Sequence, residues 1–503
     1  MVSLQAVLKT LDLPFQESSA QHAFQDLVSD PRTGTPQDLF ILLPSAKRSS
    51  AMLFQTAFSR GATAFITEDA ALCAQKEAFF IHVASVQKAL MYLCPLFYAP
   101  FPDHLVAVTG TNGKTSVTHL LHQLWKLAHI PSAALGTLGL ISSCPLPFAY
   151  PKIGPGTTPS APALHKILGA CVQHGIQHVA FEVSSHALTQ NRLTSLCPSL
   201  RIFTSFSQDH LDYHGSMSAY WDAKCRLFRQ EDGHSSWQAI LFQGLPHFEA
   251  LLSLCKAQGV SPIVYGPKEA SLPKGMTLSA TYQRMDAQRV SFTCMGYAWE
   301  SHLSFIADFQ LENLLAALCA FSLSGGQLER IIPSLSLVVS PPGRMEHVGS
   351  FRDAPIFVDY AHTPEALAFV LAALRPKTVG KIGVIFGCGG EREHEKRKAM
   401  GAIAEQLADW IIVTDDNPRH EDPHLIRQEI LSGMTHHHHV QEIFPRQEAI
   451  HQGIQTLHPG DCLIIAGKGH ELTQEIKGET FSFSDVECVQ MVCHPKGTSE
   501  VCS

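Results

Sequence analysis

Residues 105–116 read L-V-A-V-T-G-T-N-G-K-T-S, and this stretch decides the fold. Its four apolar residues predict a buried strand, and the amphipathic run Lys114–Leu127 predicts a helix. Gly110 and Gly113 allow the turn between them to point backbone amides at an anion. The lysine that begins the helix would add a charge for the β- and γ-phosphates, and Thr115 a hydroxyl for Mg²⁺. The stretch therefore predicts a nucleotide-binding loop.

The loop departs from the strict phosphate-loop pattern at one position and does not by itself identify a class of enzyme. The glycine expected five residues before Gly113 is replaced by Val108. A plain strand–helix turn with an exposed lysine is the alternative, but G-K-T stands in the context that phosphate binding requires. We find no guanine-reading N-K-x-D segment and no clear apolar strand that ends in D-E. A GTPase and a motor-type ATPase are thus both disfavoured.

The chain alternates short apolar strands with helical stretches, which predicts an α/β protein with parallel sheets. Two proline-rich seams, Ala99–Pro102 and Ser340–Gly343, predict three domains with bounds 1–99, 100–339 and 340–503. In the last domain four strands and two helices are expected, over residues 356–358, 382–386, 411–414 and 463–466, and 395–407 and 423–431. Ligands of such sheets bind at the carboxyl ends of the strands.

Composition narrows the possible partners and the location. With 503 residues the chain is long enough for several cores, and its net charge of −8 disfavours a protein that coats nucleic acid. No apolar run is long enough to span a membrane, and no export signal is visible at the N-terminus. The 14 cysteines contain no CxxC pair, which favours reduced thiols and a cytoplasmic location.

Seven further motifs follow the phosphate loop in order. They are E-V-S-S-H at 182–186, D-H-L-D-Y-H-G at 209–215, A-K-C-R-L-F at 223–228, D-Y-A-H-T-P at 359–364, F-G-C-G-G-E-R-E at 386–393, D-D-N-P-R at 415–419 and K-G-H-E at 468–471. In this order and spacing, over residues 28 to 485, the chain resembles the Mur ligases. The resemblance implies a small α/β N-terminal domain that binds UDP, a central P-loop ATPase-like parallel sheet and a Rossmann-like C-terminal α/β domain.

The resemblance also implies the reaction. An ATP-dependent amide ligase would add meso-2,6-diaminopimelate to UDP-MurNAc-L-Ala-D-Glu through an acyl phosphate, in the synthesis of peptidoglycan precursors. The implied ATP contacts are Gly110, Thr111, Asn112, Gly113, Lys114, Thr115, Ser116, Asn313, Arg344 and Asp359. The alternatives are another Mur ligase or a folylpolyglutamate-type ligase, and, in a different class, a nucleotide switch that does not ligate.

Negative charge accumulates at the implied reaction centre in both steps, so the site must supply cations. By resemblance, Thr115 and Glu182 would hold one Mg²⁺, and His210 a second. Lys224 is the most informative residue, because a free ammonium would repel Mg²⁺. In the family the corresponding lysine carries a carbamate derived from CO₂, which turns it into an anionic metal ligand. Lys114, Glu182, His210 and Lys224 are the implied catalytic residues; without the family, Lys224 would be taken for a surface lysine.

Two further sets of residues match substrate contacts of the family. The UDP-MurNAc-dipeptide would be held by Ser29, Arg32, Thr157, Thr158, Ser184, Gln190 and Arg192, with the 45–47 stretch as a further uridine contact. In the N-terminal domain, however, S-D-P-R at 29–32 stands where the family usually shows D-S-R, and a surface turn is the alternative. Diaminopimelate would be held by Arg392, Asp416, Asn417, Pro418, Arg419, Gly467 and Glu471.

Arg419 carries the specificity argument. Diaminopimelate differs from lysine by a second amino-acid head with a carboxylate, which an arginine can bind through two parallel hydrogen bonds. In the family D-N-P-R marks the diaminopimelate enzymes. We interpret the run His436–His439 as a solvated loop and Cys225 and Cys388 as buried packing residues, since acyl-phosphate chemistry needs no thiol. A monomer that binds only small molecules is expected, with no nucleic acid and no membrane insertion.

Overall fold

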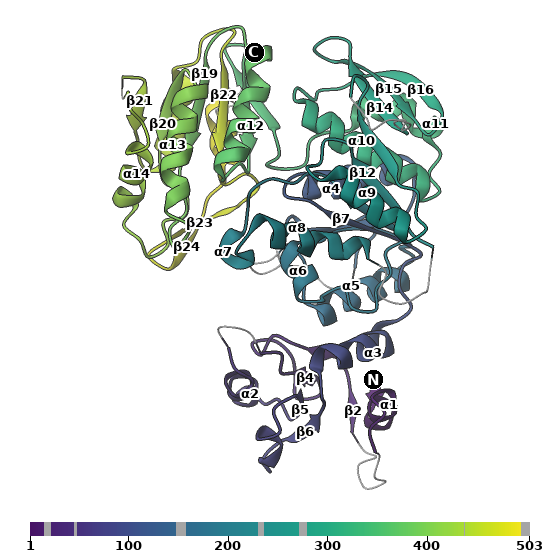
Figure 1. Cartoon of the computed structure of the whole chain (residues 1–503). Coiled ribbons are helices and arrows are strands. Elements are labelled where there is room, and N and C mark those ends of the chain that lie inside the picture. Colours follow the sequence, from purple (N-terminus) through teal and green to yellow (C-terminus); the bar gives the residue numbers. More distant parts are fainter. Residues whose placement is uncertain are drawn as a thin grey trace, which may run out of the picture. The chain divides into compact units, whose positions relative to one another are not determined.

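The structure is a computed structural model, and it describes residues 1–14, 22–44, 48–146, 157–229, 236–270, 279–436 and 438–493. The chain forms two compact units. In Figure 1 the colours follow the residue numbers from the N-terminus to the C-terminus. The first consists chiefly of Met1–Tyr265 with Ala316–Arg330, and the second of Ser279–Leu315 with Ile331–Ser503. Strands and helices alternate through both units, so the predicted α/β class is confirmed. The predicted three-domain division at 99/100 and 339/340 stays a prediction.

The first unit begins with a small parallel sheet of order β3-β4-β5-β6, and the helices α2 (Ser50–Phe58) and α3 (Val86–Tyr98) belong to the same region. Its strands are β3 (Leu27–Val28), β4 (Leu39–Ile41), β5 (Ala64–Thr67) and β6 (Phe79–His82). Two apolar clusters form its core, and both draw side chains from the strands. A short antiparallel pair, β1 (Val2–Ser3) with β2 (Ala23–Phe24), accompanies α1 (Leu4–Thr10). This region is the predicted N-terminal α/β part.

The central strand is β7 (His104–Thr109), which lies between β10 (His178–Glu182) and β11 (Leu200–Phe203) in the sheet. It pairs in parallel with both, and its five residues Leu105–Thr109 are buried, as the apolar run predicts. The turn that follows leads into α4 (Lys114–Leu127), whose bounds agree with the predicted helix. The phosphate loop therefore stands at the carboxyl end of the middle strand of a parallel array, where ligands of such sheets bind.

The central sheet is mixed rather than wholly parallel. Its order is β16-β15-β14-β13-β12-β11-β7-β10-β8-β9. The inner strands β8 (Ser132–Gly136), β12 (Gln238–Phe242) and β13 (Ile263–Pro267) continue the parallel pairing. At one end β9 (Gly139–Ser142) forms an antiparallel hairpin with β8, and at the other β14 (Ala280–Arg284), β15 (Arg289–Cys294) and β16 (Tyr297–His302) form an antiparallel meander. Short turns such as Met295–Gly296 connect the strands of these hairpins. The predicted alternation of strands and helices did not include such hairpins.

Further helices of the first unit follow α4. They are α5 (Ala161–Gln173), α6 (Ser185–Thr189), α7 (Leu211–His214), α8 (Met217–Cys225) and α9 (Phe248–Ala257). Lys224 lies in α8, and His210 directly precedes α7. In the second unit α10 (Asp308–Leu323) begins with the segment that carries Asn313 and runs on into the first unit. The short α11 (Leu328–Ile331) follows it.

The C-terminal sheet has the order β17-β18-β22-β19-β20-β21, and only β17 is antiparallel to its neighbour. Its strands are β17 (Glu346–Phe351), β18 (Ala354–Asp359), β19 (Ile382–Phe386), β20 (Trp410–Val413), β21 (Val440–Glu442) and β22 (Cys462–Ala466). One buried cluster joins one face to α12 (Pro364–Leu374), α13 (Glu395–Leu407) and α14 (Pro423–Leu431), which line up in Figure 1. A second cluster joins the other face to α15 (Arg446–Gln455) and α16 (Asp485–Cys493).

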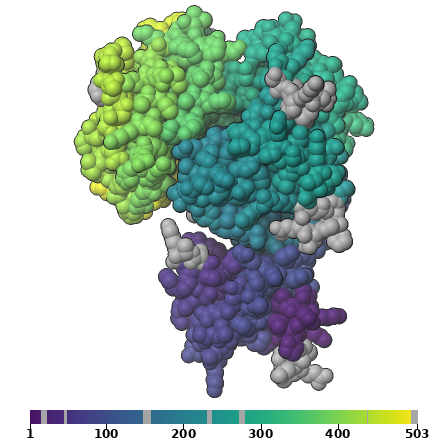
Figure 2. Space-filling model, in the orientation of Figure 1, coloured from purple at the N-terminus to yellow at the C-terminus, as the bar shows by residue number. Residues whose placement is uncertain are grey.

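Helices on both faces of a parallel sheet make this part doubly wound, which confirms the predicted Rossmann-like class. Figure 2 shows its residues, in green to yellow, as a continuous body of packed side chains. The predicted helices at 395–407 and 423–431 and the strand at 382–386 have the predicted bounds. A hairpin of β23 (Thr473–Ile476) and β24 (Glu479–Ser482) follows β22 and was not predicted.

Three smaller predictions concern features to which no role in the reaction is assigned. Of the run His436–His439, the described residues lie between α14 and β21 outside any helix or strand, as predicted. Cys225 and Cys388 are buried free thiols, and burial raises the pKa of each to about 12. No helix in the described ranges combines the length and apolar character needed to cross a membrane.

Candidate active site

The phosphate loop is held in shape by the segment that follows β11. Gly110 adopts φ +152°, and a Cβ at this position would lie 2.0 Å from the hydroxyl oxygen of Thr204. The backbone N–H of Asn112 donates to Ser205 Oγ at 2.8 Å. Thr111 Oγ1 donates to the carbonyl of Ser207 at 3.1 Å and accepts the N–H of the same residue at 3.0 Å. The loop is therefore fixed by the segment that leads to His210.

Lys114 folds back over the loop that precedes it. Its Nζ donates to the carbonyl oxygens of Gly110 at 2.9 Å and Thr111 at 2.8 Å. Thr115, the next residue, is buried in the first turn of α4 and Ser116 follows it. A lysine and a hydroxyl at this helix N-terminus suit phosphate and its counter-ion.

Lys224 is fully buried near the end of α8 and points at the same loop. Its Nζ donates to the carbonyl of Gly110 at 2.8 Å and lies 4.6 Å from the centroid of the Tyr220 ring. Burial and the nearby charge of Lys114 lower the pKa of Lys224 well below its ordinary value, while Asp209 acts in the opposite direction. A lysine held in this way is not the surface residue that its motif alone would suggest, and its amine is favoured in the neutral form.

His210 precedes α7 in a left-handed conformation, with φ +53°, and its backbone N–H donates to its neighbour Asp209. Its ring packs edge-on against His186 at 4.9 Å and Tyr220 at 6.1 Å. Burial lowers the pKa of His210, which favours the neutral imidazole that can act as a ligand.

Glu182 ends β10 with its carboxylate buried and oriented. In the parallel register it stands opposite Val108, directly before the phosphate loop. Its Oε1 accepts the backbone N–H of Thr137 at 2.7 Å, and its Oε2 accepts the hydroxyl of the same residue at 3.1 Å. A Cβ at Gly136 would lie 2.0 Å from Oε1, so only glycine leaves room for the carboxylate. Sequence reasoning missed Thr137, which lies in no motif that we used.

The four metal candidates come from four different segments of the first unit. The described residues contain no group of three or more His, Cys, Asp and Glu side chains that could hold a metal ion. The expected set needs no such group, because it combines Glu182 and His210 with Thr115 and Lys224. A carboxylate and a hydroxyl beside a phosphate loop are the oxygen donors that Mg²⁺ prefers, so these residues fit the ion.

Four of the residues expected to bind the UDP-linked substrate lie together. Thr158 Oγ1 donates to the carbonyl of Glu182 at 2.9 Å and accepts the N–H of Ser184 at 3.0 Å. Arg192 donates to the carbonyl of Thr158 and, through Nε and Nη2, to the side chain of Gln190 at 3.0 and 2.7 Å. These side chains form one polar network next to Glu182, which is a candidate metal ligand. Thr157 directly precedes Thr158 in the sequence.

The two candidates of the N-terminal region, Ser29 and Arg32, have different surroundings. Ser29 Oγ donates to Ser160 Oγ at 3.0 Å, which connects the first sheet to the N-terminus of α5. Arg32 is exposed and pairs with Asp30 at 2.8 Å, within its own turn. The surface-turn interpretation therefore describes Arg32 well and Ser29 poorly. The 45–47 stretch lies outside the described residues.

In the second unit, Asp359 ends β18, and its side chain accepts hydrogen bonds from the nearby backbone. Its carboxylate accepts the N–H groups of Met345 at 2.6 Å and Ala361 at 2.8 Å. Burial raises the pKa of Asp359 to about 6, and the guanidinium of Arg344 opposes that rise. Arg344 lies over the ring of Tyr360 at 4.6 Å, and Asn313 is buried in the first turns of α10.

The candidates for the amino-acid pocket come from three loops at the carboxyl edge of the C-terminal sheet. Asn417 donates to Glu471 at 2.9 Å, and Lys468 Nζ donates to both of these side chains at 2.9 Å. A Cβ at Gly467 would lie 2.7 Å from Asp416 Oδ2, so the loop after β22 touches the loop after β20. Lys468 is fully buried, and it completes a site that sequence reasoning assigned only to its neighbours, although it stands in K-G-H-E.

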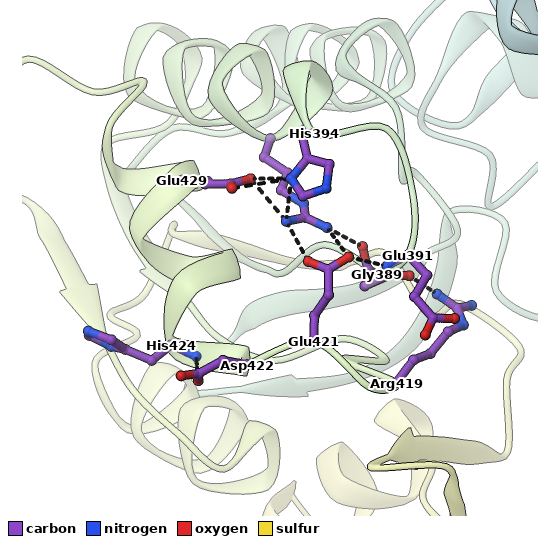
Figure 3. Close-up of polar contacts among 10 residues, drawn as sticks. Gly389, Glu391, His394, Arg419, Glu421, Asp422, His424 and Glu429 are labelled. Atoms are coloured by element: carbon purple, nitrogen blue, oxygen red, sulfur yellow. Dashed lines mark hydrogen bonds and ion pairs between the residues drawn. The ribbon is translucent and has the colours of Figure 1, made fainter.

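Arg419 and Arg392 both lie close to Gly389, since a Cβ at this glycine would be 3.0 Å from Arg419 Nη1 and 3.7 Å from Arg392 Cγ. Arg419 has φ +56°, its Nη1 donates to the carbonyl of Gly390, and its Nε lies 3.4 Å from Glu475 of β23. The close-up in Figure 3 shows this arginine extending toward Gly389 and Glu391. Arg392 is exposed on the loop that carries Gly389 and Gly390. The backbone of Pro418 lies directly against Gly390. Two guanidinium groups at one sheet edge can bind a carboxylate-bearing amino acid.

Comparison with known proteins places this geometry in a family. Residues 108–321 match the Mur ligase middle domain, and residues 343–469 match the Mur ligase glutamate ligase domain. The UDP-N-acetylmuramoyl-L-alanyl-D-glutamate–2,6-diaminopimelate ligase of Bradyrhizobium diazoefficiens is 37% identical over 460 residues, which cover 92% of this chain and 93% of that protein. The chain belongs to the Mur ligase family.

Other relatives of this Mur ligase agree. The protein of the same name from Brucella melitensis is 37% identical, over 91% of this chain and 92% of its own. A solved structure with that name is 28% identical, with a TM-score of 0.66 over 97% of this chain and 98% of its own. The MurF ligase of Thermotoga maritima, at 16% identity and a TM-score of 0.60, covers 89% of this chain and 94% of its own and shares the fold.

Proposed function

We propose that this Mur ligase adds meso-2,6-diaminopimelate to UDP-MurNAc-L-Ala-D-Glu at the expense of ATP, as a step of peptidoglycan precursor synthesis. The relatives that match over more than nine-tenths of the chain carry the name of that activity. The observation that carries the proposal is the position of Arg419 in D-N-P-R, at the carboxyl edge of the sheet beside Asn417, Lys468 and Glu471.

The reaction would proceed in two steps. A carboxylate of the dipeptide's glutamate takes the γ-phosphoryl group of ATP and becomes an acyl phosphate, with ADP released. The amine of diaminopimelate then displaces phosphate, and the amide forms. Lys114 binds the β- and γ-phosphates, and Thr158, Ser184, Gln190 and Arg192 hold the UDP-linked substrate with Thr157 and Ser29. When bound, Mg²⁺ neutralises the crowded negative charge of both steps.

Thr115 and Glu182 would hold one Mg²⁺, and His210 would hold a second Mg²⁺ together with a carbamate on Lys224. The support for the carbamate is the burial of Lys224 and its lowered pKa, because CO₂ reacts with a neutral amine. The carbamylation forms a bond from Nζ to the carbon of CO₂ and releases one proton. It replaces a buried neutral amine with an anion that can serve as a ligand of Mg²⁺.

The amino-acid pocket would be formed by Arg392, Asp416, Asn417, Pro418, Arg419, Gly467 and Glu471. Asn313, Arg344 and Asp359 would contact ATP. Three domains with seams near residues 100 and 340, a monomer and a cytoplasmic location remain part of the proposal. ATP, a UDP-linked precursor and an amino acid are all small soluble molecules, so no nucleic acid or membrane partner is required.

The experiment is a phosphate-release assay on the purified full chain. With ATP, Mg²⁺ and UDP-MurNAc-L-Ala-D-Glu present, meso-diaminopimelate should release phosphate, and L-lysine should release far less. Release with glutamate on a folate acceptor would favour a folylpolyglutamate-type ligase, which shares the fold at 16% identity in a synthase of Mycobacterium tuberculosis. Nucleotide binding without phosphate release under any of these conditions would point to a switch and overturn the proposal.

A further inference from the structure

Arg397 is a fully buried arginine in the first turn of α13, and no motif that we used includes it. Its Nη1 lies 2.9 Å from a carboxylate oxygen of Glu421 and 2.9 Å from one of Glu429. The ring of His394 lies 3.2 Å from the same nitrogen and 3.1 Å from Glu429. Figure 3 labels the partners of this group: the ring of His394 and the carboxylates of Glu421 and Glu429, which come from either end of the segment 421–429. A buried charge of this kind is stable only with its partners present.

The other terminal nitrogen of Arg397 reaches the glycine loop that precedes α13. Nη2 donates to the carbonyl of Gly389 at 3.2 Å and to Glu421 Oε1 at 3.2 Å. The same Oε1 accepts the backbone N–H of Glu391, the residue before Arg392. The hydrogen bond from Arg397 also lowers the pKa of Glu421, which keeps this acceptor ionised. One arginine and one glutamate thus hold the backbone on both sides of Gly390.

The loop that carries Arg419 is attached to the same pair. The N–H of Glu421 donates to the carbonyl of Pro418 at 3.1 Å, and the N–H of Gly390 donates to the carbonyl of Asn417 at 2.9 Å. A Cβ at Gly390 would lie 2.0 Å from the carbonyl oxygen of Pro418, so the two loops are in direct contact. Any shift of Glu421 would therefore move the loop of Arg392 relative to that of Arg419.

We propose that Arg397 is a positioning residue for the amino-acid pocket: through Glu421 it sets the spacing between the two loops that carry Arg392 and Arg419. The proposal rests on the proposed function, which assigns those arginines to the incoming amino acid. The planar fork is what the geometry uses, because its two terminal nitrogens reach Glu421, Glu429 and Gly389 together. A lysine would retain the charge but could not make the two-sided contact.

The test compares the full-length variants Arg397→Met and Arg397→Lys with the wild type. We expect the KM for meso-diaminopimelate to rise roughly tenfold to 100-fold in Arg397→Met, and less in Arg397→Lys, because small displacements of positioning groups have effects of this size. The KM values for ATP and for UDP-MurNAc-L-Ala-D-Glu should stay within about twofold, since neither substrate contacts these loops in the proposal. A uniform loss for all three substrates would mean a structural role only and would overturn the inference.

A matched control in the same part of the chain is Arg375→Met. Arg375 pairs with Asp409 at 2.7 Å, at the amino ends of β19 and β20, on the edge opposite the pocket. The substitution Arg375→Met removes an arginine–carboxylate pair but leaves the loops of Arg392 and Arg419 unchanged, so the KM for diaminopimelate should not change. An equal rise of that KM in Arg375→Met and Arg397→Met would contradict the positioning role.

Glu421→Gln provides a second variant, which is isosteric and keeps the inference testable if Arg397→Met does not fold. Alone it should raise the KM for diaminopimelate selectively, and combined with Arg397→Met the two effects should not add, because both break the same link. Independent, additive effects would exclude the route through Glu421. Wild-type protein that shows no diaminopimelate-dependent phosphate release would instead refute the proposed function, whatever the variants do.

Discussion

Lys114 and Lys224 donate to a single acceptor, the carbonyl oxygen of Gly110, at 2.9 and 2.8 Å. Their Nζ atoms can be no farther apart than the sum of these two distances, although Lys224 comes from a helix more than a hundred residues away. Two ammonium groups so close repel each other, and for the buried one the neutral form is favoured. The arrangement makes the second lysine suitable for conversion into an anion, and it can be tested directly.

We predict that Lys224→Ala lowers ligase activity by at least about 100-fold, a loss typical of a missing catalytic group. A small carboxylate such as formate or acetate, added at high concentration, should restore part of the activity of Lys224→Ala. The exposed Lys126 on α4 provides the control, and Lys126→Ala should retain wild-type activity. Full activity of Lys224→Ala without any added carboxylate would exclude the carbamate.

Arg419→Ala should abolish the use of diaminopimelate. Removing an arginine that pairs with a buried carboxylate costs about 2–5 kcal/mol, which is a loss of roughly 30-fold or more in kcat/KM. Steady-state kinetics with varied diaminopimelate, at saturating ATP and UDP-linked substrate, measure this loss. Arg419→Lys should recover little, because a lysine lacks the fork. Kinetics within a few-fold of the wild type would remove the basis for the specificity.

Gly136→Ala should disable the site through Glu182. The added Cβ would lie 2.0 Å from Oε1, so the carboxylate must leave its position against Thr137. We expect the Mg²⁺ concentration for half-maximal activity to rise about tenfold or more, since misoriented ligands bind metal weakly. Gly349→Ala is the control, because its nearest neighbours would lie 3.7 Å from the new Cβ. An unchanged Mg²⁺ requirement in Gly136→Ala would show that Glu182 does not need this orientation.

Stability should depend on pH through Glu312, which lies in α10 next to Asn313. Burial, together with the charge of Asp308, raises the pKa of Glu312 to about 7 from an ordinary value of 4.5. The folded state therefore holds a proton that the unfolded state releases between these values. The stability that this group contributes is fully present below about pH 4.5 and is lost as the pH rises through 7.

The variant Glu312→Gln removes this dependence. Between pH 5 and pH 8, we expect the wild type to lose about 3 kcal/mol more than Glu312→Gln, from two units of pH at 1.4 kcal/mol each. Urea unfolding at both values measures the difference. The exposed Glu365 on α12 gives the control, and Glu365→Gln should follow the wild type. Parallel curves for wild type and Glu312→Gln would mean that the carboxyl is ionised throughout.

Much of the architecture was predictable because periodicity and glycine placement are local properties. The bounds of α4, α13 and α14 and the buried strands β7 and β19 agree with the sequence. The antiparallel β14–β16 meander and the β23–β24 hairpin were not predicted, since their short strands alternate weakly and depend on turns. Element type was thus easier to predict than the edges of a sheet.

In the site, the motifs identified candidates but not the contacts between them. Thr137, Lys468 and Arg397 hold Glu182, Asn417 and Glu421, and each pair is far apart in sequence. Such pairs are set by strand order and loop path, which a single sequence does not contain. Arg32 shows the converse, because it stands near a family position but binds Asp30 in its own turn.

The three loops of the amino-acid pocket touch one another through glycines that leave no space, at Gly387, Gly390 and Gly467. For protein engineering, this means that substrate preference is distributed over segments from residue 387 to residue 475. A segment that replaced D-N-P-R would have to follow the same backbone path, because the glycines of the two neighbouring loops lie against it with no room to spare. A successful exchange of specificity would have to transfer all three loops together with Arg397 and Glu421.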